Sequence, residues 1–165
     1  PSAVQPWVLS STVPARAGAT LAEHPDVTAN IVAWSKVSRT AFWRAQHLRF
    51  PQGLYEDQAV TQTMYVRARA IDTIPEPVVH WRVRAEGTSI TQHEADPAVL
   101  AAVLDALREG LDILRREGPD VAVRARIGQI LQMDVPRLRA LDLGDVPRAA
   151  VEDFAAELEE SLAEG

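Results

Sequence analysis

The chain has 165 residues, of which 47% are apolar and 24% are charged, and its net charge is −6. A chain of this length forms roughly one domain with its own buried core. It contains no cysteine, which excludes disulfides, thiolate metal sites and thiol catalysis. No apolar run approaches the roughly 18 residues of a membrane span, and no secretory signal pattern opens the chain. We therefore expect a cytoplasmic protein.

The charge is distributed unevenly along the chain. Residues 1–95 hold nine Lys and Arg against eight Asp and Glu, whereas residues 96–165 hold eight against fifteen. Binding to a phosphate backbone needs a basic stripe, so the acidic second part argues against nucleic acid as a partner. Sixteen of the seventeen basic residues are arginine, and Lys36 is the single lysine.

Short strand-like runs alternate with turns in the first part of the chain. Helices are predicted for residues 39–46, with Ser38 as the expected N-cap, and for residues 58–69. One helical turn is expected at 20–24, and residues 10–20 have the composition of a loop. The predicted strands and extended pieces are 4–9, 30–37, 48–50, 70–74, 78–83 and 88–91.

After residue 95 the pattern becomes helical. Asp96 and Pro97 suit the first two positions of a helix, and apolar residues then repeat with the helical period until Gly118. A second helix is predicted after Pro119. Residues 133–144 look turn-rich, and Val146 begins a last amphipathic helix. We therefore divide the chain into a mixed α/β part, residues 1–95, and a helical part, residues 96–165, with about three helices.

Four ordered blocks carry a resemblance to a known family. They read AWSKVSRTAFW from Ala33, LRFPQGLYEDQ from Leu48, IDTIPEPV from Ile71 and WRVRAEGTSIT from Trp81. They resemble the C-terminal half of family-2 glycosyltransferases, which are inverting enzymes of the GT-A fold, and especially the bacterial members that build capsule, cell-wall or teichoic-acid-type polymers. The resemblance implies an α/β fold, with the C-terminal part of a GT-A sheet in residues 1–95 followed by an all-helical tail.

The resemblance also implies roles for residues in these blocks. Asp57 takes the family's general-base position and would accept the proton of an acceptor hydroxyl, while Glu56 would shape the acceptor side. Outside the resemblance, an aspartate just before a helix is usually an N-cap, and the two roles are compatible. The other implied residues are Lys36, Tyr55 and Trp81 on the acceptor side and Arg82, Arg84, Thr88 and Ser89 at the donor diphosphate.

The planar guanidiniums of Arg82 and Arg84 suit phosphate oxygens, although an isolated Arg-x-Arg on a strand is more often a solvated surface. The resemblance further implies a divalent metal, Mg or Mn, bound mainly by a missing N-terminal half. Family members often place a histidine ligand where Arg84 stands, so His80, four residues upstream of that position, is only a weak metal candidate. Residues 1–50 contain no Asp-x-Asp motif and no Gly-rich phosphate loop.

Two functions follow from these observations. In the first, the chain is a segment of a sugar transferase that uses a nucleotide-sugar donor and a hydroxyl acceptor, either a glycan or a polyol-phosphate, at the inner face of the membrane, and is inactive without its donor-binding half. In the second, it is a non-catalytic module on a degenerate transferase framework that binds a protein partner through the acidic helices. The first predicts that Asp57, His80 or Arg82, and Ser89 converge on one concave face.

Overall fold

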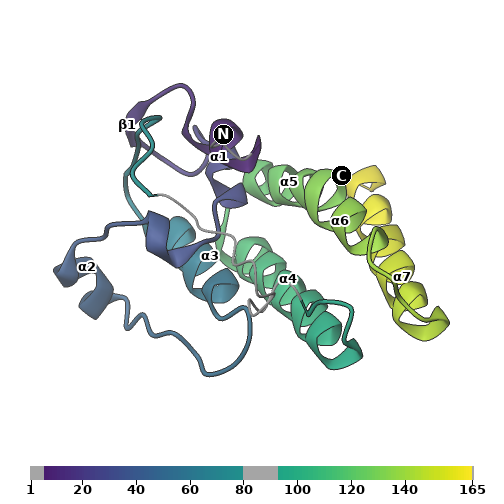
Figure 1. The fold of residues 1–165 in the computed structure, drawn as a ribbon. Coiled ribbons are helices and arrows are strands. Elements are labelled where there is room, and N and C mark those ends of the chain that lie inside the picture. The colour runs from purple at the N-terminus through teal and green to yellow at the C-terminus, as the bar shows by residue number, and fades with distance from the viewer. Residues whose placement is uncertain (1–5, 80–92, 165) are drawn as a thin grey trace.

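A computed structural model describes residues 6–79 and 93–164 and shows a helical protein (Figure 1). Its helices and strands, in chain order, are α1 (Pro6–Thr12), β1 (Arg16–Ala19), the 3₁₀ helices η1 (Pro25–Ala29) and η2 (Ala33–Ser35), α2 (Thr40–Ala45), α3 (Asp57–Arg67), β2 (Ile71–Thr73), α4 (Pro97–Glu117), α5 (Asp120–Gln129), the π-helix η4 (Ile130–Asp134), α6 (Val135–Arg139) and α7 (Asp145–Ala163).

The sheet is the largest departure from the sequence prediction. Within the described residues it consists of β1 and β2 alone, paired antiparallel with Arg16 opposite Thr73 and Ala19 opposite Ile71. The Asp72 carboxylate accepts a hydrogen bond of 2.6 Å from the Gly18 N–H across this pair. The predicted α/β class, with part of a GT-A sheet in residues 1–95, is therefore wrong for this structure, in which helices dominate.

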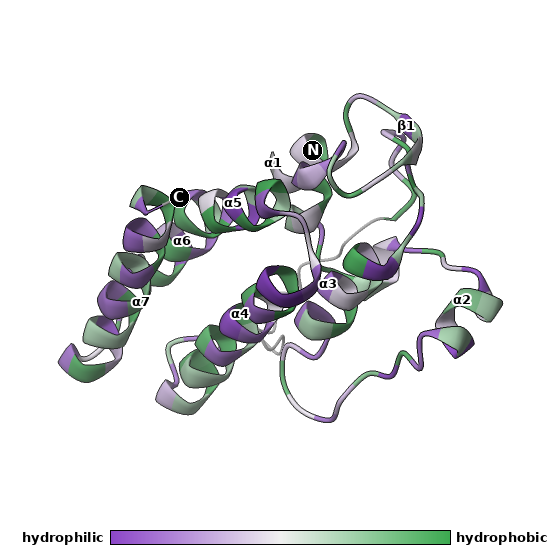
Figure 2. Cartoon of the chain, turned by 180° about the vertical axis from the view of Figure 1, so that it is seen from behind, coloured by the Kyte–Doolittle hydropathy of each residue, from purple (hydrophilic) through white to green (hydrophobic). Residues whose placement is uncertain are grey.

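The main core lies in the second part of the chain, where α4, α5, α6 and α7 pack together. Their apolar stripes supply a continuous cluster of buried side chains, including Leu107, Leu111, Ile130 and Phe154. Figure 2 shows these helices with alternating hydrophobic and hydrophilic faces. The helices predicted from the apolar repeats at 97–118 and from Val146 onward are confirmed, because such a stripe is buried only when the segment is helical.

The start of α4 is fixed by the predicted cap. The Asp96 carboxylate accepts hydrogen bonds from the N–H groups of Ala98 at 2.8 Å and Val99 at 3.3 Å, and Pro97 occupies the first turn, where no N–H is needed. These contacts satisfy two of the N–H groups that a helix leaves unpaired at its start.

We expect Asp96→Ala to lower the free energy of unfolding by about 1 kcal/mol because both capping hydrogen bonds are lost. Chemical denaturation should show this loss, together with a fall in Tm of about 2–4 °C. Asp105→Ala, on an exposed position of the same helix, is the control, and an equal loss in both variants would contradict a capping role.

The helix that follows Pro119 is longer than predicted. The turn-rich stretch expected from residue 133 is instead helical as far as Arg139, because α5 continues through η4 into α6. The Val135 N–H bonds to the Ile130 carbonyl, one residue further back than in an α-helix. This widening precedes Pro136, whose ring lacks an N–H and clashes with the carbonyl four residues before it in a regular helix.

The predicted strand at 30–37 is also wrong, and its backbone hydrogen bonds explain why. The segment contains η2 and directly follows η1, and several carbonyls here are paired with side chains in place of a neighbouring strand. Gln62 donates to Thr28 O at 3.0 Å, Tyr65 to Asn30 O at 2.7 Å, and Thr61 to Ile31 O at 2.7 Å. Because buried carbonyls must find donors, these three side chains of α3 hold the segment in an irregular path.

Other predictions had mixed outcomes. The helices at 39–46 and 58–69 and the strand at 70–74 are confirmed within a few residues, whereas the strand at 4–9 is wrong, since α1 covers residues 6–12. Ser38 does not cap α2, whose N-cap position is Arg39. The pieces at 80–83 and 88–91 lie outside the described residues.

Among the described residues no helix is both long and apolar enough to cross a membrane.

Candidate functional site

One stripe of α3 contains the candidate base and faces the segment at 30–36. Asp57, Thr61 and Tyr65 are spaced four residues apart, so they lie on the same side of the helix. Thr61 and Tyr65 bond to carbonyls of that segment, and the backbone N–H of Ala33 and the Lys36 ammonium both act to lower the pKa of Asp57. The stripe therefore places the Asp57 carboxylate against η2.

Burial governs the chemistry of Asp57. It is half-buried, and this burial, with the adjacent Glu56 carboxylate, raises the pKa of Asp57, while the Lys36 ammonium and the Ala33 hydrogen bond act in the opposite direction. A carboxylate with a raised pKa accepts a proton more readily. Asp57 is the first residue of α3, and Glu56 occupies the N-cap position without a side-chain hydrogen bond to the helix, so the simple N-cap interpretation of Asp57 does not describe this geometry.

Lys36 is brought close to Asp57 from a different sequence block. Its Nζ donates to Val32 O at 2.7 Å, Asn30 Oδ1 at 2.9 Å and Ser35 Oγ at 3.4 Å, and it lies 5.6 Å from the centre of the Tyr65 ring. Burial lowers the pKa of Lys36 to about 7, and the Asp57 carboxylate acts against this. Three acceptors match the three N–H bonds of an ammonium, so Lys36 stabilises the segment and, in its protonated form, places a positive charge beside the base.

Tyr55 has a strained backbone immediately before the carboxylate pair. Its φ is 59°, in the left-handed region that an aromatic residue rarely adopts. Its hydroxyl donates to Glu94 Oε1 at 2.7 Å, and Glu94 is only 3% exposed. Burial raises the pKa of Tyr55, which keeps the hydroxyl protonated as a donor. Strain of this kind is found most often where the surrounding structure fixes a functional side chain.

The remaining predicted site residues lie outside the described residues. They are His80, Trp81, Arg82, Arg84, Thr88 and Ser89. The convergence expected between Asp57 and this segment, and the donor-side roles implied for it, therefore stay predictions. Of the acceptor-side set, the structure brings Lys36, Tyr55, Glu56 and Asp57 together around the start of α3.

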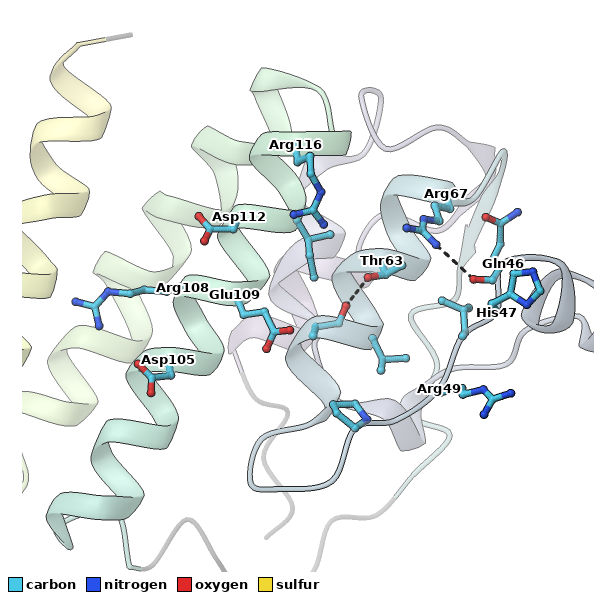
Figure 3. Close-up of a pocket in the computed structure, with 15 residues that line it drawn as sticks. Gln46, His47, Arg49, Thr63, Arg67, Asp105, Arg108, Glu109, Asp112 and Arg116 are labelled. Atoms are coloured by element: carbon cyan, nitrogen blue, oxygen red, sulfur yellow. Dashed lines mark hydrogen bonds between the residues drawn. The ribbon is translucent and has the colours of Figure 1, made fainter.

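A groove of about 640 Å³ borders the next face of α3 (Figure 3). Asp105, Glu109 and Asp112 project along one edge from α4, opposite His47 and Arg49 of the loop that follows α2. Asp57 does not line this groove. The groove is therefore a separate surface feature of mixed charge, one helical face away from the candidate base.

The implied metal can be tested only against the described residues. In residues 6–79 and 93–164 no group of three or more His, Asp or Glu side chains lies close enough together to hold an ion. The metal implied by the resemblance, whose main ligands were expected in another part of the protein, therefore stays a prediction, and we derive no step through it.

Four charged residues near the site were not identified from the sequence. They are Glu94, which lies just before the helical part, and Arg126, Asp134 and Arg137 within it. Arg126 did carry a signal, since it lies three residues after Val123 and four before Ile130, on the apolar side of its helix. A guanidinium in that position indicates a buried ion pair, and Arg126 is 3% exposed.

In comparisons with known proteins, no protein-family model, curated protein or solved structure matches the chain.

Proposed function

We propose that this chain carries the acceptor-activating part of an inverting glycosyltransferase, with Asp57 as the general base. In the proposed reaction the Asp57 carboxylate takes the proton of an acceptor hydroxyl, and that oxygen forms a bond to the anomeric carbon of a nucleotide-sugar. The bond from this carbon to the donor diphosphate breaks on the opposite face, and the nucleoside diphosphate leaves with its electron pair. The acceptor class is a glycan or polyol-phosphate hydroxyl.

The observation that supports the proposal best is the proximity of the Lys36 ammonium and the Asp57 carboxylate. They belong to separate blocks of the family resemblance, residues 33–43 and 48–58, yet in the fold their charges are close enough to shift each other's pKa. The carboxylate is half-buried, which raises its pKa and makes it a stronger proton acceptor than an exposed aspartate. The strained residue before it, Tyr55, adds a second sign of a positioned group.

The proposal assigns donor binding mostly to other parts of the protein. Arg82 and Arg84 would contribute contacts to the diphosphate, and their guanidiniums would offset the charge that develops on the leaving group. A polymer-building role would place the enzyme in the cytoplasm at the inner face of the membrane, where nucleotide-sugars meet nascent acceptors.

The test is sugar transfer by a polypeptide that contains this chain together with a donor-binding part. Under saturating nucleotide-sugar, Asp57→Asn should lower turnover by at least about 10²-fold, the usual contribution of a general base, while the donor Kd stays near wild type. Glu56→Gln should have the smaller effect because Glu56 makes no proton transfer in this scheme. Full turnover by Asp57→Asn would reject the proposal and favour a non-catalytic interaction module.

A further inference from the structure

A series of polar contacts connects Tyr55, directly before the Glu56-Asp57 pair, to Gln58, directly after it. The first half begins at Tyr55, whose hydroxyl donates to the buried Glu94 carboxylate. The second oxygen of Glu94 pairs with Nη1 of Arg137, in α6. Tyr55 is thus tied to the second part of the chain through two charge-assisted hydrogen bonds, which are the strong kind.

The second half runs from α6 back to α3. The other nitrogen of the Arg137 fork, Nη2, bonds to Asp134 Oδ1 at 3.3 Å. The second Asp134 oxygen lies 3.7 Å from Nη2 of Arg126, and that nitrogen also donates to Gln58 Oε1 at 3.3 Å. Gln58 directly follows Asp57, so the contacts close around the carboxylate pair. We call this closed set of side chains the polar ring; it comprises Tyr55, Gln58, Arg126, Asp134, Arg137 and Glu94.

The charges of the polar ring balance. Two carboxylates alternate with two guanidiniums. The two neutral members, Tyr55 and Gln58, lie on either side of the Glu56-Asp57 pair. Glu94, Arg126 and Gln58 are each less than 5% exposed, and buried charges persist only when they are paired in this way. Replacing a buried ion pair by apolar side chains is often neutral or stabilising, so the burial of the Glu94 and Arg126 charges is poorly explained by stability alone.

The polar ring also accounts for the strained turn. A residue other than glycine in the left-handed region persists only where its surroundings hold it, and the hydroxyl of Tyr55 is anchored to Glu94. The turn is closed on its other side by the Gln58 N–H, which donates to Tyr55 O at 3.2 Å. Tyr55 and Gln58 are therefore each fixed by the backbone and by the polar ring, and Asp57 stands between them.

We propose that the polar ring holds the Glu56-Asp57 turn in its working conformation, which makes Glu94, Arg126 and Arg137 positioning residues for the candidate base. The effect on turnover rests on the proposed function, whereas the effect on the turn does not. The helices after residue 95 are then part of the site, since four of the six members follow Val79 and lie in or beside them.

The experiment measures the turn and the reaction separately. In the 165-residue chain, the ¹³C shift of the Asp57 carboxyl and hydrogen exchange of the Gln58 amide report the turn directly. Arg137→Gln and the milder Tyr55→Phe, which keeps every charge, should change the carboxyl shift and speed the exchange. In the polypeptide with its donor-binding part, Arg137→Gln should lower turnover on the order of 10-fold or more, since small displacements of a reacting group are costly, with donor KM unchanged.

The matched control is Arg139→Gln, two residues along the same helix. Arg139 pairs with Glu152 at 3.0 Å on an exposed surface, so its loss should leave the shift, the exchange and turnover as in wild type. Arg137→Lys should rescue only part of the effect because one ammonium cannot bridge two carboxylates as a planar fork does.

Different experimental results would reject the positioning role and the proposed function separately. A Tyr55→Phe protein with an unchanged Asp57 shift and unchanged Gln58 exchange would overturn the polar ring as a positioning device, whatever the activity. An inactive Asp57→Asn protein combined with a fully active Arg137→Gln protein would overturn it while preserving the proposed function. An active Asp57→Asn protein would instead remove the proposed function and leave the effect on the turn to be judged by the two spectroscopic readouts.

Discussion

Asp57→Asn is expected to change activity and stability in opposite directions. Turnover should fall by at least about 10²-fold because an amide cannot take the acceptor proton. The free energy of unfolding at neutral pH should rise, because burial and the neighbouring Glu56 raise the pKa of Asp57 in the fold, which means that its ionised form is destabilising there. Residues placed for chemistry often oppose stability in this way.

The pH dependence of this stability gain follows from linkage. Below the ordinary pKa of an aspartate, about 4, Asp57 is protonated in the folded and the unfolded chain, and the substitution should have little effect. As the pH rises through the window between that value and the raised pKa in the fold, the unfolded chain loses its proton first and wild-type stability falls. The advantage of the Asp57→Asn variant should therefore appear across this window and remain at neutral pH, as measured by urea denaturation at a series of pH values.

Asp145→Asn is the matched control for Asp57→Asn. Asp145 is also the first residue of a long helix, α7, but it is exposed. Its substitution should cost about 0.3–1 kcal/mol because a negative charge at a helix start is favourable. If Asp57→Asn destabilised the protein at neutral pH by a similar amount, Asp57 would be acting through the helix start and not as a buried carboxylate.

Phe154→Ala is expected to cause the largest loss of stability, about 3–5 kcal/mol. The ring is fully buried at the centre of the cluster formed by α4 to α7, and the Arg108 guanidinium covers it at 4.9 Å from the ring centre. Removing the ring leaves a cavity that the surrounding helices fill only partly. Set against a typical total of about 5–15 kcal/mol, this loss should lower Tm by roughly 10 °C or more.

Val146→Ala on the same helix provides the control. Val146 is 82% exposed, so its truncation should change the free energy of unfolding by no more than about 0.5 kcal/mol. Far-UV and near-UV circular dichroism should give coincident unfolding curves for both variants. A Phe154→Ala protein whose helix signal is lost in a separate early step would indicate that α7 unfolds independently of the core.

Sequence patterns predicted the helices of this fold well where burial alone decides the structure. α4 and α7 bury one continuous apolar stripe, and Asp96 marks the start of α4. α3 was predicted from a weaker pattern, since its buried side includes Gln58, Thr61 and Gln62. Those side chains are polar because they satisfy groups on other segments, and a pattern within one segment cannot reveal such partners.

The same limit explains the main errors. The run at 30–37 has the apolar and β-branched residues of a strand, but a strand needs a neighbour that supplies backbone hydrogen bonds. The carbonyls of Asn30 and Ile31 bond instead to side chains of α3, thirty or more residues away in the chain. The predicted α/β class came from the family resemblance together with strand-like runs such as this one and residues 78–83, of which Val78 and Val79 are described and lie outside the sheet.

The candidate site was predicted only in part for a related reason. Lys36, Tyr55 and Asp57 were selected because of the family resemblance, and the fold brings them together. Glu94 and Arg137 gave no local signal, because their importance comes from a contact between segments 43 residues apart. The long-range pairing of charges is decided by how α6 leaves the π-helix, which sequence spacing does not show.

The π-helix determines the direction in which α6 presents its side chains. A regular α-helix of the same sequence would place every residue after the widened turn about 100° further around the axis, the angle between successive residues. Arg137 would then point away from Glu94. The widened turn takes up this extra residue, because the Val135 N–H bonds to the Ile130 carbonyl across five residues. Deleting Gln132 should therefore convert this turn to a regular α-helical one and leave the contact between Arg137 and Glu94 in place.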